Sequence, residues 1–165
     1  MMTRTLAIDP GNTESAYVVI DNTTRRPLEH AKLPNHELLT HIDRLEPVPV
    51  VIEMVASYGM PVGADVFETC VWIGRFMETA ARRQPYDTPD LIKRHPVKMH
   101  HCHDSRAKDS NIIQALVDRF AKGQSNRGKG TKSNPGWFYG FRADVWQAYA
   151  LAVYVADKLE AGEQP

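Results

Sequence analysis

The chain has 165 residues, of which 42% are hydrophobic and 24% are charged, and its formal net charge is zero. These values predict one globular domain with an ordinary core, and they exclude a disordered chain or a fibre. No apolar run approaches the roughly 18 residues that span a membrane, and the N-terminus lacks the apolar stretch of a secretory signal. With only two cysteines, Cys70 and Cys102, we expect free thiols and a cytoplasmic protein.

The neutral total hides an uneven distribution of charge. No acidic residue lies between Asp118 and Asp144, and only Asp104 interrupts the basic stretch 93–108. The first of these stretches contains Arg119, Lys122, Arg127, Lys129, Lys132 and Arg142. Such segregation predicts a face that binds a polyanion, and the alternative is a solvated basic loop.

The hydrophobic pattern predicts strands and helices in a definite order. Strands are expected at 6–8, 16–20, 28–33, 48–52 and 91–92, and helices at 35–45, 64–83, 105–120 and 143–160. Asn35 is a candidate cap for the first helix. The order predicts a single α/β domain over residues 1–165, with a central mixed sheet of five strands flanked by helices. The segment at about 121–136 is rich in Gly and Ser, which predicts a mobile basic loop.

Two acids follow apolar strands directly. Asp9 comes after Leu6-Ala7-Ile8, and Glu53 after Val50-Val51-Ile52. A carboxylate at such a place is costly unless something compensates its charge. If the two strands are neighbours, a divalent cation such as Mg²⁺ or Mn²⁺ resolves the repulsion. The alternative is that each acid only accepts hydrogen bonds from its own loop.

A third acid, Asp144, opens the Ala-rich last helix, with Gln147 one turn later on the same face. An acid at a helix N-terminus is also favoured by the helix dipole, so this position alone has a purely structural explanation. The three acids together favour a metal-dependent site more strongly than any one of them does.

The motifs Leu6-Ala7-Ile8-Asp9-Pro10-Gly11, Val51-Ile52-Glu53, Arg106-Ala107-Lys108-Asp109 and the final helix beginning at Asp144 resemble the RuvC family of Holliday-junction resolvases. The resemblance covers nearly the whole chain. It implies the RNase H-like fold, a homodimer, and two Mg²⁺ ions held by four acids. Three of those acids correspond to Asp9, Glu53 and Asp144. The fourth position is Gln147, so we expect one of the two metal sites to be weakened.

The resemblance also suggests residues that bind DNA. Lys98 and Lys108 stand where the family uses lysines at the scissile region, Lys108 in a catalytic role, although any surface lysine has ordinary solvation as its alternative. An aromatic wedge is expected after the second acid; Tyr58 and Met60 are available there, but Ala56 occupies the usual position. Tyr58 therefore has a core or dimer contact as its alternative. The remaining candidate DNA contacts are Arg106, Arg127, Lys129 and Lys132. The predicted helix 64–83 is the candidate dimer contact.

A histidine cluster, His100-His101-Cys102-His103, raises the alternative of a zinc site. Structural zinc usually takes four ligands from two separated pairs, and the sequence offers no second cysteine pair. We instead interpret these histidines as polar strand or loop residues on the basic face.

The sequence thus predicts a Mg²⁺-dependent endodeoxyribonuclease of DNA recombination and repair, with Mn²⁺ able to substitute. It would resolve four-way junctions and other branched DNA by paired, symmetric nicks. The alternatives are an RNase H-like nuclease for flaps, forks or RNA hybrids, a binder of branched DNA that does not cut, and, more weakly, an actin-like phosphate-binding domain. The compact length, the departures from the family pattern and the single-domain form resemble the phage-encoded branch of the family, which implies a protein acting in the host cytoplasm.

Overall fold

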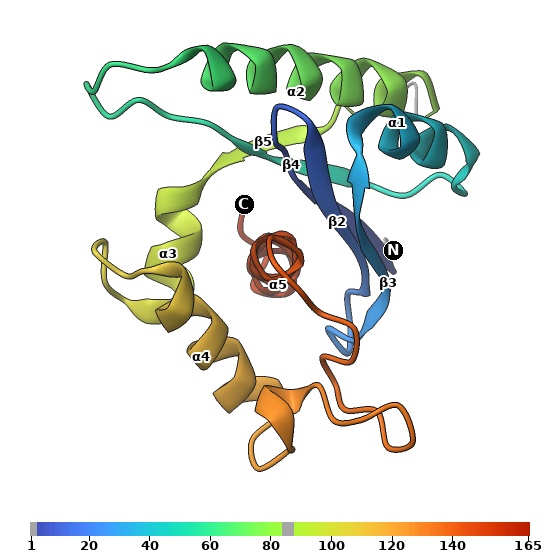
Figure 1. The fold of residues 1–165 in the computed structure, drawn as a ribbon, viewed down its shortest axis with the longest axis vertical. Coiled ribbons are helices and arrows are strands. Elements are labelled where there is room, and N and C mark those ends of the chain that lie inside the picture. Colours follow the sequence, from blue (N-terminus) through green and yellow to red (C-terminus); the bar gives the residue numbers. More distant parts are fainter. Residues whose placement is uncertain (1–2, 84–87) are drawn as a thin grey trace.

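The computed structural model describes residues 3–83 and 88–165, which form a central sheet with helices on both faces (Figure 1). The strands are β1 (Arg4–Asp9), β2 (Glu14–Asp21), β3 (Pro27–Pro34), β4 (Val50–Met54) and β5 (Asp90–Lys93). Their order is β3-β2-β1-β4-β5; β1, β2 and β3 are antiparallel neighbours, whereas β4 is parallel to β1 and β5 is parallel to β4. The predicted mixed five-stranded α/β architecture is therefore confirmed.

The helices form two unequal layers. They are α1 (Asn35–Arg44), α2 (Ala64–Arg83), α3 (Arg94–Cys102), α4 (Asp109–Phe120), the short 3₁₀ helix η1 (Asn126–Gly128) and α5 (Val145–Glu160). Figure 1 shows α1 and α2 on one side of the sheet and α5 on the other, with α3 and α4 packed beyond α5. None of the described helices is both long enough and apolar enough to cross a membrane.

Strand alternation divides the core between these layers. In β1, Leu6 and Ile8 face α1 and α2, whereas Ala7 faces α5. Because successive side chains of a strand point to opposite faces, Asp9 lies on the α5 side with Ala7. The side chains of α5 are buried almost throughout its length, from Val145 to Ala156, because the helix is enclosed by the sheet and by α3 and α4.

The strand register lines up one residue from each strand in a single row. Asp9 pairs with Ala16, Ala16 pairs with Lys32, and Glu53 follows beside Asp9 in the parallel strand β4. From edge to edge the row is Lys32, Ala16, Asp9, Glu53 and Ile92. Ala16 and Ile92 belong to the core on the α5 side, so the whole row faces the start of α5.

Two local predictions are corrected by the structure. The helix expected over 105–120 begins at Asp109, and α3 occupies part of a region for which no helix was predicted. Asn35 does not cap α1, because Pro34 holds the cap position. The buried Asn35 side chain instead accepts a hydrogen bond from the Ser15 hydroxyl at 2.6 Å and donates one to the Gly11 carbonyl at 2.9 Å.

The predicted basic loop has a defined backbone course. It contains η1 and a short antiparallel bridge between Gly130 and Pro135. At Gly128, where φ is +81°, an added Cβ would lie 2.5 Å from the Ala121 side chain, so this close approach requires glycine. The predicted mobility of the segment stays a prediction.

Candidate active site

Asp9 and Glu53 occupy the carboxyl ends of the adjacent parallel strands β1 and β4. Both side chains are largely buried. Burial raises the pKa of Asp9 well above its ordinary value, and the charges of Glu53 and Asp144 raise it further. Burial likewise raises the pKa of Glu53, with the positive charge of Arg94 acting in the opposite direction. Glu53 and Asp144 thus both repel an ionised Asp9, while the metal site that these three acids are predicted to form stays a prediction.

Asp144 stands at the N-cap of α5, directly over the row described above. Its carboxylate oxygen Oδ2 lies 2.6 Å from the Lys32 ammonium nitrogen, which reaches it from the edge strand β3. The Asp144 side chain is half exposed and that of Lys32 about one quarter exposed. This ion pair therefore connects the sheet edge to the start of α5 at the mouth of the site.

Arg94 provides a second fixed cation. It begins α3 immediately after β5, so its backbone position is next to the row. Its guanidinium forms an ion pair with Glu53 at 3.4 Å and a shorter one with Asp109, the first residue of α4. Arg94, on α3, thus connects the buried carboxylate of Glu53 on β4 to Asp109 at the start of α4.

Gln147 lies one helical turn after Asp144 and is 5% exposed. Its side chain offers an oxygen ligand without a negative charge. Gln147 is thus a buried residue of the first turn of α5, and its role as a ligand stays a prediction.

The other predicted site residues are distributed unevenly around the acids. Lys98, on α3, is close enough for its charge to lower the pKa of Glu53. Lys108 caps α4 next to Asp109, and Arg106 is exposed in the preceding turn. Tyr58 is 67% exposed in the connection between β4 and α2, and it has a positive φ of 48°.

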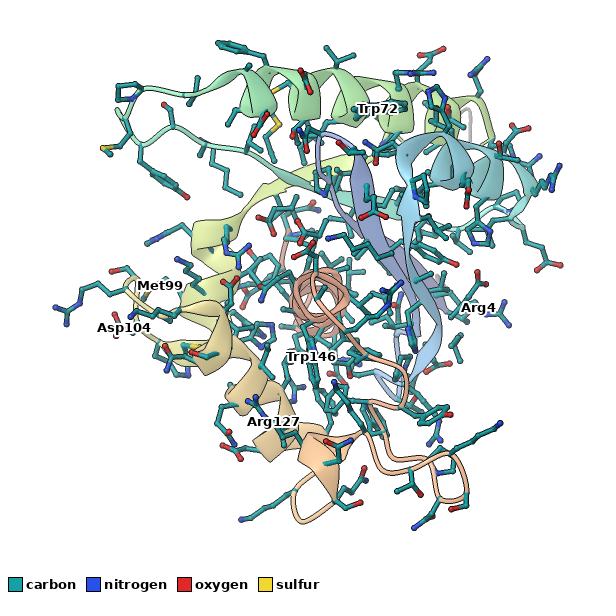
Figure 2. The ribbon with its side chains drawn as sticks, viewed as in Figure 1. Arg4, Trp72, Met99, Asp104, Arg127 and Trp146 are labelled. Carbon is teal, nitrogen blue, oxygen red and sulfur yellow. The ribbon has the colours of Figure 1, made fainter. Side chains whose placement is uncertain are left out.

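The loop residues Arg127, Lys129 and Lys132 lie away from the acids. The loop follows the C-terminus of α4, whereas Asp109 opens that helix, so the 12 residues of α4 separate them by about 18 Å. Figure 2 shows Arg127 beyond the far end of α4. These side chains extend a basic surface from the site and do not contact the carboxylates.

The histidines are not arranged as predicted. His100 and His101 lie in α3 rather than in a strand or loop, and both face α5. One ring nitrogen of His100 lies 2.7 Å from the Asp157 carboxylate, and His101 Nε2 lies 2.8 Å from the Ala150 carbonyl oxygen. Their role is to join α3 to α5, so the expectation that they belong to the exposed basic face was wrong.

Sequence reasoning missed Lys32, Arg94 and Asp109 as members of the site. Arg94 carried a usable signal, since it lies two residues after the predicted strand 91–92. Lys32 carried none, because its position depends on the register between β2 and β3.

The donor set suits a hard divalent cation. Asp9, Glu53 and Asp144 supply carboxylate oxygens and Gln147 an amide oxygen, which are the ligands that Mg²⁺ and Mn²⁺ prefer. Burial and the charges of Glu53 and Asp144 raise the pKa of Asp9, so an ionised Asp9 would be stabilised by a bound cation. Among the described residues, no three His, Cys, Asp or Glu side chains are gathered closely enough to hold one metal ion; Glu53 and Asp144 are turned to Arg94 and Lys32 instead.

A five-stranded sheet in this order, with acids at the ends of β1 and β4 and at the start of the packed final helix, defines an RNase H-like domain. The chain is similar to solved structures of RuvC from Thermus thermophilus. One has 17% sequence identity and a TM-score of 0.65, with 96% of each chain covered. Another, RuvC in complex with a Holliday junction substrate, has 14% identity and a TM-score of 0.68, with 97% of this chain and 96% of that chain covered.

No protein-family model and no curated protein sequence matches the chain. The similarity to RuvC therefore rests on the course of the backbone. At that level it confirms both the predicted RNase H-like fold and the predicted resemblance to RuvC.

Proposed function

We propose that this protein is a divalent-metal-dependent endonuclease that resolves four-way DNA junctions by paired, symmetric nicks. The observation that carries the proposal is the placement of Asp9 and Glu53 on adjacent strands of a RuvC-like fold, with Asp144 at the start of the helix that packs on their face of the sheet. Acidic side chains that repel one another lower the stability of the fold. Binding a cation for a reaction on a phosphodiester would explain why they are present.

Asp9, Glu53 and Asp144 would hold Mg²⁺ or Mn²⁺, with Gln147 as a neutral fourth ligand. The bound ion would supply a more acidic water and positive charge for the phosphate oxygens. In the hydrolysis the water oxygen forms a new bond to phosphorus while the bond from phosphorus to the 3′ oxygen breaks. The water gives up a proton and the leaving 3′ oxygen gains one, so the products carry 5′-phosphate and 3′-hydroxyl ends.

The chain's own cations would position the scissile strand. Lys98, whose charge already acts on Glu53, lies on α3, and Lys108 and Arg106 stand at the N-terminus of α4. Lysine and arginine in such positions stabilise the charge that develops on the phosphate oxygens. Arg127, Lys129 and Lys132 would bind the phosphates of a duplex arm further from the cut.

Two subunits would be needed for paired nicks. Phe67 and Val71 on α2 are each more than 60% exposed, which makes this helix the candidate face for a twofold dimer. Tyr58 and Met60, both strongly exposed before α2, would lie near the junction centre, where an aromatic side chain can separate stacked bases.

A gel assay on end-labelled four-way junction, flap and linear duplex DNA tests the proposal, with Mg²⁺, Mn²⁺ or EDTA in each reaction. We expect symmetric nicks on the junction that require the metal. Preferential cutting of the flap would identify a different RNase H-like nuclease. Tight junction binding without cutting in either metal would contradict the nuclease proposal and favour a protein that only binds branched DNA. In that case Glu53 and Asp144 would have a structural role, through their ion pairs with Arg94 and Lys32.

A further inference from the structure

Lys32 is the one residue of the Asp9 row that brings a positive charge to the carboxylates. It pairs with Ala16, which pairs with Asp9, so the lysine and the aspartate lie on the same face of the sheet with only a small side chain between them. The Lys32 ammonium lies 2.6 Å from Asp144 Oδ2 and within electrostatic range of Asp9. It therefore contacts one carboxylate of the site and faces a second.

Four carboxylates and the two ion-paired cations of the site balance for a single divalent ion, and Lys98 acts on Glu53 from outside this set. Four carboxylates, those of Asp9, Glu53, Asp109 and Asp144, are gathered there when ionised. Lys32 and Arg94 make ion pairs with three of them. The three paired carboxylates and their two cations carry a net charge of −1. An ionised Asp9 brings the total to −2, which one divalent cation neutralises. Gln147 adds an oxygen but no charge, so it does not call for a second cation.

A fixed ammonium group can do part of the work of a metal ion. In sites with two metals, the ions clamp the phosphate and stabilise both the attacking and the leaving oxygen. Lysine provides a compact positive charge that serves the same electrostatic purpose without a proton transfer. At Asp144 this charge is already present on the protein.

We propose that Lys32 is a positioning residue of the active site, whose ammonium group holds Asp144 in place of a second divalent cation, so that each chain takes one divalent ion. This inference rests on the proposed nuclease function. It distinguishes the protein from a nuclease that needs two divalent ions. It also explains why a neutral residue, Gln147, can occupy the position of the fourth acid.

The test is the number of divalent ions bound per chain without DNA, measured by titration with Mn²⁺ and electron paramagnetic resonance of the free ion. The wild-type protein should bind one ion. The double variant Lys32→Met/Gln147→Asp removes the fixed cation and adds a carboxylate, so it should bind two. Lys32→Arg keeps the charge and should stay at one, and Lys158→Met, at the far end of α5, is the matched control.

Cleavage of the junction gives a second readout. We expect Lys32→Met to cut about 10²-fold more slowly, as for loss of one group that stabilises transition-state charge, with Lys32→Arg restoring most of the rate. The rate of the wild type should depend on the first power of the Mg²⁺ concentration, and that of the double variant on a higher power.

The outcomes separate this inference from the function on which it rests. A wild-type protein that binds no divalent ion and cuts no junction would overturn the nuclease proposal itself. A wild-type protein that cuts but binds two ions per chain would overturn only the role of Lys32. The same holds if Lys32→Met neither slows cutting nor, together with Gln147→Asp, changes the number of bound ions.

Discussion

Asp9 and Glu53 end adjacent parallel strands and face the same helix, so that the charge of Glu53 adds to burial in raising the pKa of Asp9. A sheet that needed only stability would place apolar residues at these two positions. The pair therefore lowers stability at a point where the proposed chemistry would use both carboxylates, and the first two predictions follow from it.

Glu53→Gln should abolish cutting while sparing DNA binding. The substitution keeps the shape of a largely buried side chain but removes a charge that the metal ion needs. We expect a loss of at least about 10³-fold in the cleavage rate, measured on a labelled junction, with an unchanged dissociation constant. Glu46→Gln, at an exposed loop position, is the matched control and should cut normally. A Glu53→Gln protein that cuts at a near-normal rate would remove Glu53 from the site.

Asp9→Asn should stabilise the protein in EDTA. Because the pKa of Asp9 is raised in the folded state, folding favours its protonated form. Below the ordinary pKa of an aspartate, Asp9 is protonated in both states and its ionisation costs the folded protein nothing. Above the raised pKa of the folded state, Asp9 is ionised and the full cost applies. The free energy of unfolding therefore falls as pH rises from the ordinary pKa to the raised one. Asparagine carries no such cost. In thermal unfolding with EDTA, the variant should melt above the wild type at pH 8, and the difference should shrink toward pH 4.

Added Mg²⁺ should reverse this order, because only the wild type retains the Asp9 carboxylate that binds the ion. If Asp9→Asn lowers the melting temperature in EDTA at pH 8, then the Asp9 carboxylate is stabilised by its surroundings, contrary to the argument from burial and like charge.

The strand positions and the acids could be predicted because their signals are local. An apolar strand followed by a carboxylate can be recognised in the sequence without knowing which strand pairs with it. Asp9 and Glu53 were predicted in this way. Lys32 could not be found, since it meets Asp144 only through the antiparallel register of β3 on β2, which includes an irregularity between Val19 and Ile20. Such pairing between strands is a property of the folded sheet.

The missed helix α3 has a different cause. No helix was predicted over this segment, because its histidines were interpreted as polar strand or loop residues. Pro96 is the third residue of α3, within the first turn, where backbone N–H groups have no partner inside the helix and proline costs little. Tertiary contacts then fix the segment, because His100 and His101 both bind α5.

Neutralising the basic loop should weaken junction binding in a salt-dependent way. We would combine Arg127→Asn, Lys129→Gln and Lys132→Gln; asparagine tolerates the positive φ of 55° at position 127. Each lost phosphate contact reduces the slope of log affinity against log salt by about 0.9, so the slope should fall by about 2 to 3. The slope is measured from binding isotherms at salt concentrations between about 50 and about 200 mM.

The control for the loop variant is Arg44→Ala/Arg82→Ala, which removes two exposed charges from the α1 and α2 layer. It should leave the slope unchanged. An equal loss of slope in both proteins would show that only total charge matters and that the loop is not a DNA contact.

Phe67→Glu should convert a dimer into a monomer. Phe67 and Val71 are 63% and 62% exposed at i and i+4 on α2, and Gly74 follows on the same face with nothing near the place of a Cβ. A charge at position 67 of this apolar stripe would be buried without a partner in the interface and should prevent self-association. Light scattering after gel filtration measures the mass, and cutting should change from paired to unlinked single nicks. Leu28→Glu adds the same charge at an exposed site on β3 and should stay dimeric; a wild-type monomer would contradict the prediction outright.

His101 should make the protein lose stability between pH 6.5 and 4. Its Nε2 lies 2.8 Å from the Ala150 carbonyl oxygen, which can only accept, so the neutral ring donates through Nε2. Burial lowers the pKa of His101 to about 4. Because this pKa is depressed on folding, the stability that neutral His101 confers is complete above about 6.5 and lost as pH falls toward 4, by about 3 kcal/mol. His101→Gln keeps a donor without a titrating group, so its unfolding free energy in urea should fall less over this range. His103→Asn changes an exposed histidine at the end of α3 and should follow the wild type; parallel pH profiles for His101→Gln and the wild type would show that His101 does not titrate against folding.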